Sequence, residues 1–168
     1  MKILETERLL LREMTAKDAE FVLELLNTPK FIKYIGDRGV RSAEEAADFI
    51  ENRYRQSYRD HGYGLYTVEL RSGTPIGICG FVRRDTLPDP DIGFSFLPEY
   101  EGQRFGYESA EAMIQYGRHV LDMDRILAIT SLDNHGSVGL LNKLGFSEID
   151  KIDTPNGETL RLFSLENS

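Results

Sequence analysis

The amino-acid sequence predicts an α+β fold built around a central, mostly antiparallel sheet. Strand-like and helix-like segments follow one another in the order strand, helices, three strands, helix, strand, helix, two strands. Two pairs of strand-like segments flank the short turns "RSGT" and "PNG", and such pairs favour hairpins. The length of 168 residues, with 40% hydrophobic and 29% charged residues, is typical of a globular protein, so we expect residues 1–168 to form a single domain.

The first strand and helix are predicted from a run of leucines and a capping pattern. Residues 6–14, "TERLLLREM", favour a strand. Thr15 followed by Asp18 resembles a capping box, in which two side chains satisfy free N–H groups at the start of a helix. We therefore expect a helix over residues 17–27.

Two more helices are expected before the next strands. Pro29 suits the first turn of a short helix that Gly36 ends. Ser42 with Glu45 forms the pattern Ser-x-x-Glu, a second capping box. Apolar residues then recur at helical spacing, which predicts a helix that runs to about Asp60.

The remaining elements follow from apolar runs between turn signals. In chain order they are strands at 62–70, 75–83 and 90–97, a helix from about 105 to 121, a strand at 125–132, a helix at 135–144, and strands at 146–153 and 158–165. Gly145 ends the last helix at a position where a residue with positive φ is common.

The charge of the chain argues against a nucleic-acid partner. The sequence has 28 acidic and 20 basic side chains, a net charge of -8, and no basic cluster beyond the pair Arg83 and Arg84. An acidic field favours cationic small molecules or basic peptides as partners. The alternative is that the acidity serves only solubility.

A single cysteine excludes a disulfide within the chain and a cysteine-based zinc site. Cys79 lies in an apolar strand, where we expect a buried small side chain and not a nucleophile. We expect no metal. The first residues lack the apolar core of a signal peptide, and no apolar run approaches a membrane span. These features predict a cytoplasmic protein with no membrane partner.

The segment "EYEGQRFGYESAEAM", residues 99–113, has the layout of a phosphate-binding loop at a helix N-terminus. Gly102 and Gly106 allow the backbone to approach a ligand closely. Arg104 stands between them, and Glu101 opens the loop with a negative charge. On its own this pattern also fits a plain turn from a strand into a helix.

A second segment, "DNHGSVGLLNKLGF", carries a resemblance to a known family. Its pattern is Asn-x-x-Ser, six residues, then Lys-x-Gly-Phe, formed by Asn134, Ser137, Lys143, Gly145 and Phe146. This pattern resembles the GCN5-related N-acetyltransferases (GNAT). The amino-terminal "ETERLLLREMTAKDAEFVLELLNTPKFIKYIG" and the stretch "IGFSFLPEYEGQRFGYESAEAMIQYG" look like the ribosomal-protein N-terminal acetyltransferase (RimJ/RimL-like) branch. The resemblance extends over nearly the whole chain.

The resemblance implies an α/β/α fold with helices on both faces of the sheet and a splayed pair of strands. It implies an enzyme that moves an acetyl group from acetyl-CoA directly to a primary amine, on a peptide N-terminus or a small molecule. Two alternatives remain at this point. The protein is then either a non-catalytic or regulatory member that binds acyl-CoA, or an interaction domain that has lost the cofactor. The oligomeric state is open, a homodimer included.

The family's cofactor loop reads Arg/Gln-x-x-Gly-x-Gly/Ala, and this chain departs from it. A gapless match puts Glu101, Arg104 and Gly106 at the three marked positions, and only Gly106 agrees. Arg104 carries a Cβ and does not freely take a positive φ, but its guanidinium suits a phosphate. The resemblance assigns pyrophosphate binding to the loop as a whole, namely Gly102, Gln103, Arg104, Phe105 and Gly106.

The resemblance also places the rest of the cofactor. Backbone groups near Phe94 and Phe96 would pair with the acetyl carbonyl and the pantetheine arm, and Asn134 would bond the pantetheine from the other side. Lys143 would approach the charged end of the cofactor, and its alternative is a solvated lysine at a helix C-terminus.

Two residues are candidates for catalysis. Asp91 stands where the family often has a strand glutamate, so it is the candidate base, directly or through water, and its alternative is a polar turn residue in "PDPD". Ser137 matches the serine that gives a proton to the leaving thiolate, although a serine in a first helical turn also caps the backbone. The acceptor pocket is expected between residues 31–42 and 83–90.

Overall fold

A computed structural model describes residues 1–166 of the chain. Its strands are β1 (Lys2–Glu5), β2 (Leu9–Arg12), β3 (Leu65–Leu70), β4 (Pro75–Val82), β5 (Asp91–Phe96), β6 (Arg125–Ser131), β7 (Ser147–Asp153) and β8 (Thr159–Glu166). Its α-helices are α1 (Ala19–Leu26), α2 (Pro29–Tyr34), α3 (Ala43–Phe49), α4 (Gln56–His61), α5 (Phe105–His119) and α6 (His135–Lys143). Short helical turns of other types are η1 (Ala16–Asp18), η2 (Ile50–Arg55) and η3 (Pro98–Tyr100).

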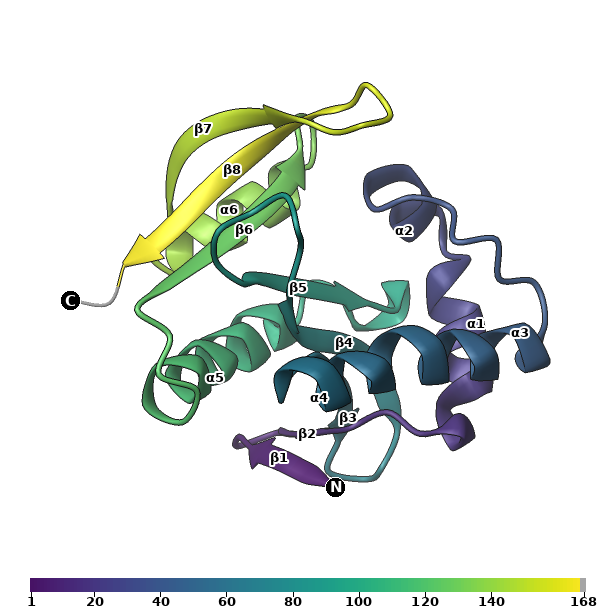
Figure 1. The fold of residues 1–168 in the computed structure, drawn as a ribbon. Helices are drawn as coiled ribbons and strands as arrows, with labels where there is room; N and C mark the ends of the chain where they lie inside the picture. Colours follow the sequence, from purple (N-terminus) through teal and green to yellow (C-terminus); the bar gives the residue numbers. More distant parts are fainter. Residues whose placement is uncertain (167–168) are drawn as a thin grey trace.

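The strands form one eight-stranded sheet in the order β1-β2-β3-β4-β5-β6-β8-β7. Every neighbouring pair is antiparallel except β5 and β6, which run parallel. These two strands pair only between Asp91 and Leu127 and then diverge, as Figure 1 shows. The predicted mixed, mostly antiparallel sheet with a splayed pair of strands is therefore confirmed.

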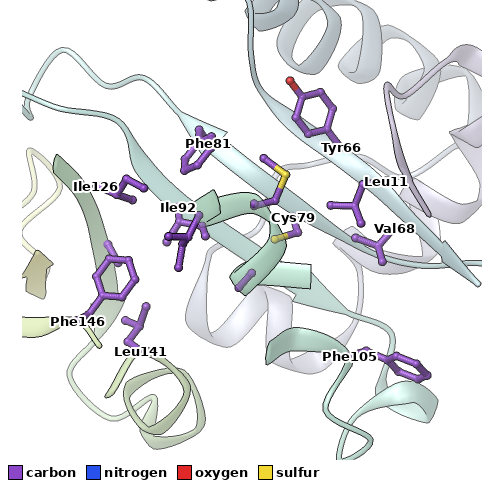
Figure 2. Close-up of a cluster of buried hydrophobic side chains, with 14 of the residues drawn as sticks. Leu11, Tyr66, Val68, Cys79, Phe81, Ile92, Phe105, Ile126, Leu141 and Phe146 are labelled. Carbon is purple, nitrogen blue, oxygen red and sulfur yellow. The ribbon is translucent and has the colours of Figure 1, made fainter. Parts of the chain in front are cut away.

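Helices cover both faces of the sheet, as expected. One hydrophobic cluster packs α5 and α6 against one face and includes Cys79, Phe81, Ile92 and Phe146 (Figure 2). A second cluster packs α1, α3 and η2 against the other face of the sheet. Cys79 is fully buried, as predicted, and burial raises the pKa of its thiol to about 12, so the thiol stays protonated.

The strand predicted over residues 6–14 is present as β2 (Leu9–Arg12), but a further strand, β1 (Lys2–Glu5), precedes it and was not predicted. The N–H of Thr6 donates to the carbonyl of Leu9 (2.9 Å), and this bond closes a turn between β1 and β2. Glu108 on α5 accepts from the Arg8 N–H (3.0 Å), which holds the turn against the helix. This contact joins residues that are 100 positions apart, so no local sequence pattern reveals the turn.

The helical segment after Ser42 is confirmed, with one difference in its cap. The Ser42 hydroxyl accepts from the Glu45 N–H (3.1 Å), but the Glu45 carboxylate binds the Arg41 N–H (3.0 Å), so the box is displaced by one residue. The run continues through the π-helical turn η2 into α4 and ends at Gly62 with φ of 77°. The capping box of Thr15 and Asp18 is complete.

Candidate active site

A cavity of about 1370 Å³ opens where β5 and β6 part. Its walls come from β5, β6, the loop before α5, the start of α6, helix α2, the run from α3 to α4, and the β7–β8 turn. The space between the diverging strands is thus lined by elements from both sides of the sheet.

The open edge of β5 presents unpaired backbone groups to this cavity. Leu97 donates its N–H toward β4, to Ile76 (2.9 Å), whereas the carbonyl of Pro90 points the other way and accepts from Leu127 of β6 (3.0 Å). Backbone groups of successive residues point to alternate edges of a strand. The N–H and C=O groups of Phe94 and Phe96 therefore face the edge that β6 has left.

The loop before α5 holds a row of free N–H groups. Among residues 1–166, the six consecutive N–H groups from Gly102 to Tyr107 donate no hydrogen bond within the protein. Gly102 has φ of 76° and Arg104 has φ of 68°, followed by right-handed helical residues. Alternation of left- and right-handed conformations turns successive N–H groups into one concavity that suits an anion. The helix dipole of α5 adds to this preference.

Arg104 adopts the positive φ that the sequence argument disfavoured. A non-glycine residue in this region is strained by about 1–2 kcal/mol, so the surroundings must hold it there. Arg8 does so from β2's turn, because it donates to the Gln103 carbonyl (3.0 Å), stacks over the Phe105 ring at 4.3 Å, and pairs with Glu108 (2.7 Å).

The negative charge of Glu101 is compensated within the loop's own surroundings. Its carboxylate pairs with Lys30 of α2. Because this ion pair offsets the charge of Glu101, the electrostatic potential at the loop is set mainly by its N–H groups. The departure from the family pattern at position 101 is thus neutralised by a residue 71 positions away.

Gly106 allows α5 to approach α6 closely. A Cβ on Gly106 would lie 3.2 Å from Cδ2 of Leu140 on α6 and 3.7 Å from the Phe96 ring. A side chain at this position would require Leu140 to move by a few tenths of an ångström, so glycine allows the first turn of α5 to pack against α6 without this adjustment.

Asn134 and Ser137 lie at the start of α6, on the cavity wall. The Asn134 side chain caps the helix by accepting from the Ser137 N–H (3.3 Å). Within residues 1–166 the Ser137 hydroxyl makes no hydrogen bond, so it is available to a ligand. Lys143, at the other end of α6, is exposed and also borders the cavity.

Thr130 on β6 was not predicted and has an unsatisfied polar atom. Its hydroxyl is buried without a hydrogen-bond partner among the described residues, and the residue borders the cavity. An unpaired buried hydroxyl costs about 1–3 kcal/mol. The sequence carries no motif for Thr130, so only the structure reveals it.

Asp91 is buried at the closed end of the splay, with an exposed fraction of 1%. Burial raises the pKa of its carboxyl group, and Arg84, whose Nε donates to Asp91 at 2.9 Å, opposes this rise. Asp91 is also among the residues that border the cavity. Its carboxyl group is therefore a buried group that Arg84 partly compensates, next to the cavity.

These groups fit acetyl-CoA. The row of N–H groups suits a pyrophosphate, and the open edge of β5 suits the amide groups of an extended pantetheine arm. Thr130, whose hydroxyl is buried without a partner among the described residues, also borders the cavity. The site combines an anion cradle with a strand edge that binds an extended chain.

The chain belongs to the acetyltransferases of the GNAT family, because the model of the acetyltransferase (GNAT) domain matches residues 8–147. It is accordingly an acetyltransferase that uses acetyl-CoA. In the residues that the structure describes, no helix is long and apolar enough to cross a membrane.

Particular relatives differ in what is known of them. The chain is 30% identical over 148 residues to the uncharacterized N-acetyltransferase YoaA of Bacillus subtilis (strain 168), covering 87% of this chain and 83% of YoaA. It is 23% identical over 138 residues to the spermidine N(1)-acetyltransferase of Escherichia coli (strain K12), covering 82% and 72%. It shares its fold with RimL, a ribosomal L7/L12 alpha-N-protein acetyltransferase in complex with coenzyme A, at a TM-score of 0.85 and 15% identity over 99% of this chain and 98% of that one.

Proposed function

We propose that this protein transfers an acetyl group from acetyl-CoA directly to a primary amine on a small molecule or a peptide N-terminus. The observation that carries the proposal is the row of six free N–H groups from Gly102 to Tyr107, which opens into the same cavity as the unpaired edge of β5. A cytoplasmic location, a single domain and membership of the RimJ/RimL-like branch belong to the same proposal.

The cofactor lies along the splay in this proposal. Gly102, Gln103, Arg104, Phe105 and Gly106 bind the pyrophosphate through their N–H groups. Phe94 and Phe96 bind the acetyl carbonyl and pantetheine arm through the backbone, and Asn134 and Thr130 face them from α6 and β6. Lys143 and the Arg104 guanidinium lie on the cavity wall and attract the charged end.

Acetyl-CoA supplies an acyl group that is already activated as a thioester. The chain's own residues then have three tasks. A free N–H on the β5 edge donates to the carbonyl oxygen where negative charge develops. Asp91 takes a proton from the attacking amine, directly or through water, because only the neutral amine is nucleophilic. Ser137 gives a proton to the leaving sulfur.

Glu101 and Arg104 were the reasons to consider a non-catalytic member. Their surroundings favour the enzyme, because Lys30 compensates Glu101 and Arg104 completes the concave loop without loss of a free N–H. A direct transfer also agrees with Cys79, whose thiol is buried away from solvent.

Calorimetry with acetyl-CoA followed by thiol release against a panel of amines tests the proposal. We expect micromolar binding and release of one thiol per acetylated amine. Binding without release on a broad panel would favour a non-catalytic acyl-CoA binder. Absence of binding at millimolar acetyl-CoA would contradict both.

A further inference from the structure

The charge of the cavity wall is opposite to that of the whole chain. Seven lysines and arginines border the cavity against four aspartates and glutamates, although the chain carries a net charge of -8. Two of the acidic groups are already paired, Asp91 with Arg84 and Glu101 with Lys30. A third, Asp60, accepts from the Gln56 amide (2.8 Å). The wall therefore offers an excess of positive charge to whatever binds there.

Only Lys30 and Arg84 among these seven cationic groups form an ion pair within residues 1–166, and the unpaired ones include Arg38 and Arg53. Among residues 1–166, the guanidinium groups of Arg38 and Arg53 form no ion pair and no hydrogen bond, although Arg53 lies over the Phe49 ring at 5.3 Å. Desolvation lowers the pKa of Arg38, and the like charge of Arg53 lowers it further. Both residues border the same cavity, where an anion bound between them would relieve this like-charge interaction.

These arginines lie away from the loop that suits the pyrophosphate. Arg53 belongs to η2, which packs on the sheet face opposite α5. Arg38 also feels the charge of Arg84, which pairs with Asp91 at the first residue of β5. The loop begins beyond the last residue of that strand, and a six-residue strand is about 20 Å long. The arginine pair is therefore at the acceptor end of the cavity.

We propose that the acceptor is an amine that also bears an anionic group, a carboxylate or a phosphate, which Arg38 and Arg53 bind while its amine faces Asp91. This inference rests on the proposed function and names its substrate class. Guanidinium groups bind carboxylate and phosphate through paired N–H donors. A polyamine such as spermidine would instead bring more positive charge to a cationic wall. This proposal of an acceptor with an anionic group replaces the expectation of a cationic acceptor that the net charge of the chain suggested.

The test compares acceptors that differ only in the anionic group. The pairs are β-alanine with β-alaninamide, phosphoethanolamine with ethanolamine, and a tripeptide amide with aspartate or asparagine at its second position, with spermidine added. Thiol release gives kcat/KM for each. We expect the anionic member of at least one pair to exceed its neutral partner and spermidine by tenfold or more. The pair that shows the preference identifies the source of the anion.

Variants assign the preference to the two arginines. We expect Arg38→Gln and Arg53→Gln each to lower kcat/KM for the anionic acceptor about tenfold, with the neutral acceptor and the affinity for acetyl-CoA unchanged. Arg59→Gln is the matched control, because it removes the same charge from the same helical run at a residue that does not border the cavity. Equal loss for both acceptors, or no loss, would overturn the inference.

Failure of the inference and failure of the proposed function give different results. Spermidine or neutral amines used as well as anionic ones would overturn the anionic acceptor and leave the acetyltransferase in place. If none of the amines causes thiol release, the proposed function is contradicted. In that case, calorimetry of the coenzyme A complex with β-alanine and β-alaninamide still decides the inference. A tenfold preference for β-alanine supports it, and equal affinities overturn it.

Discussion

The two ends of the cavity are built from different parts of the chain. The proposed cofactor end is made of backbone groups, namely the free N–H groups from Gly102 to Tyr107 and the open edge of β5. The proposed acceptor end is made of long side chains, with Arg38 and Arg53 at its wall. A site made of backbone tolerates many sequences, whereas a site made of side chains changes with each substitution. This difference explains how the cofactor loop departs from the family pattern while its geometry remains suitable.

Ser137 lies on the cavity wall, and its removal should have the largest effect if it is the proposed proton donor. We expect Ser137→Ala to lower kcat about 100-fold with little change in the affinity for acetyl-CoA, because the hydroxyl acts only when the thiolate leaves. Steady-state kinetics and calorimetry measure the two quantities. Ser137→Thr keeps a hydroxyl and should recover part of the rate. An unchanged kcat in Ser137→Ala would remove Ser137 from the mechanism.

A change of backbone conformation should damage the cofactor end alone. Gly102 has φ of 76°, and a β-branched residue is strained there. We expect Gly102→Val to weaken acetyl-CoA binding about tenfold or more. Gly73→Val in the β3–β4 turn, at φ of 94°, is the control, because it suffers similar strain away from the cavity. Similar loss of Tm in both variants, with weaker binding only in Gly102→Val, would support the backbone cradle. Unchanged binding in Gly102→Val would contradict it.

The charge of Arg104 should matter less than its conformation. We expect Arg104→Ala to weaken coenzyme A binding about threefold, the worth of an exposed charge. Arg104→Gly loses the same charge but relieves the positive φ of 68°, so it should have a higher Tm than Arg104→Ala. Calorimetry and thermal unfolding separate the two contributions. Binding by Arg104→Ala as tight as that of the parent chain would show that the guanidinium is not a phosphate ligand.

The smallest expected effect is a shift of a pH profile at the acceptor end. Burial raises the pKa of Asp91 while Arg84 opposes the rise, so Arg84→Gln should raise this pKa further. If Asp91 is the base, the rate is lost as pH falls through its pKa. The acid limb of kcat/KM should therefore move to higher pH in Arg84→Gln, with a similar maximal rate. A limb that stays in place would exclude Asp91 as the base.

Much of the fold could be predicted from the sequence, because its signals are local. The alternation of apolar residues, the caps at Thr15 and Ser42, and the turns between strands report on neighbouring positions. The additional strand β1 before β2 was missed, and the turn that joins them is held by Glu108 from a distant helix. Elements were thus predictable where their causes lie within a few residues.

The candidate site was predictable only where a motif spans it. Asn134 and Ser137 stand in a recognisable pattern, and the structure brings both to the cavity wall. The compensation of Glu101 by Lys30 and the pairing of Asp91 with Arg84 depend on tertiary contacts. Arg38 and Arg53 carry no motif, and the net charge of the chain indicated the wrong sign for their surroundings. Side chains that gather from separate elements leave no pattern along the sequence.

The splay has a consequence for how the sheet holds together. The strands from β1 to β5 meet the strands from β6 to β8 at a single register position, Asp91 with Leu127. An extended ligand that bonds to the edge of β5 on one side and to groups on β6 and α6 on the other would connect the two parts of the sheet by hydrogen bonds. In the proposed binding mode, the cofactor thus adds hydrogen bonds across a junction that the hydrophobic cluster already spans, and its binding raises the stability of the folded chain.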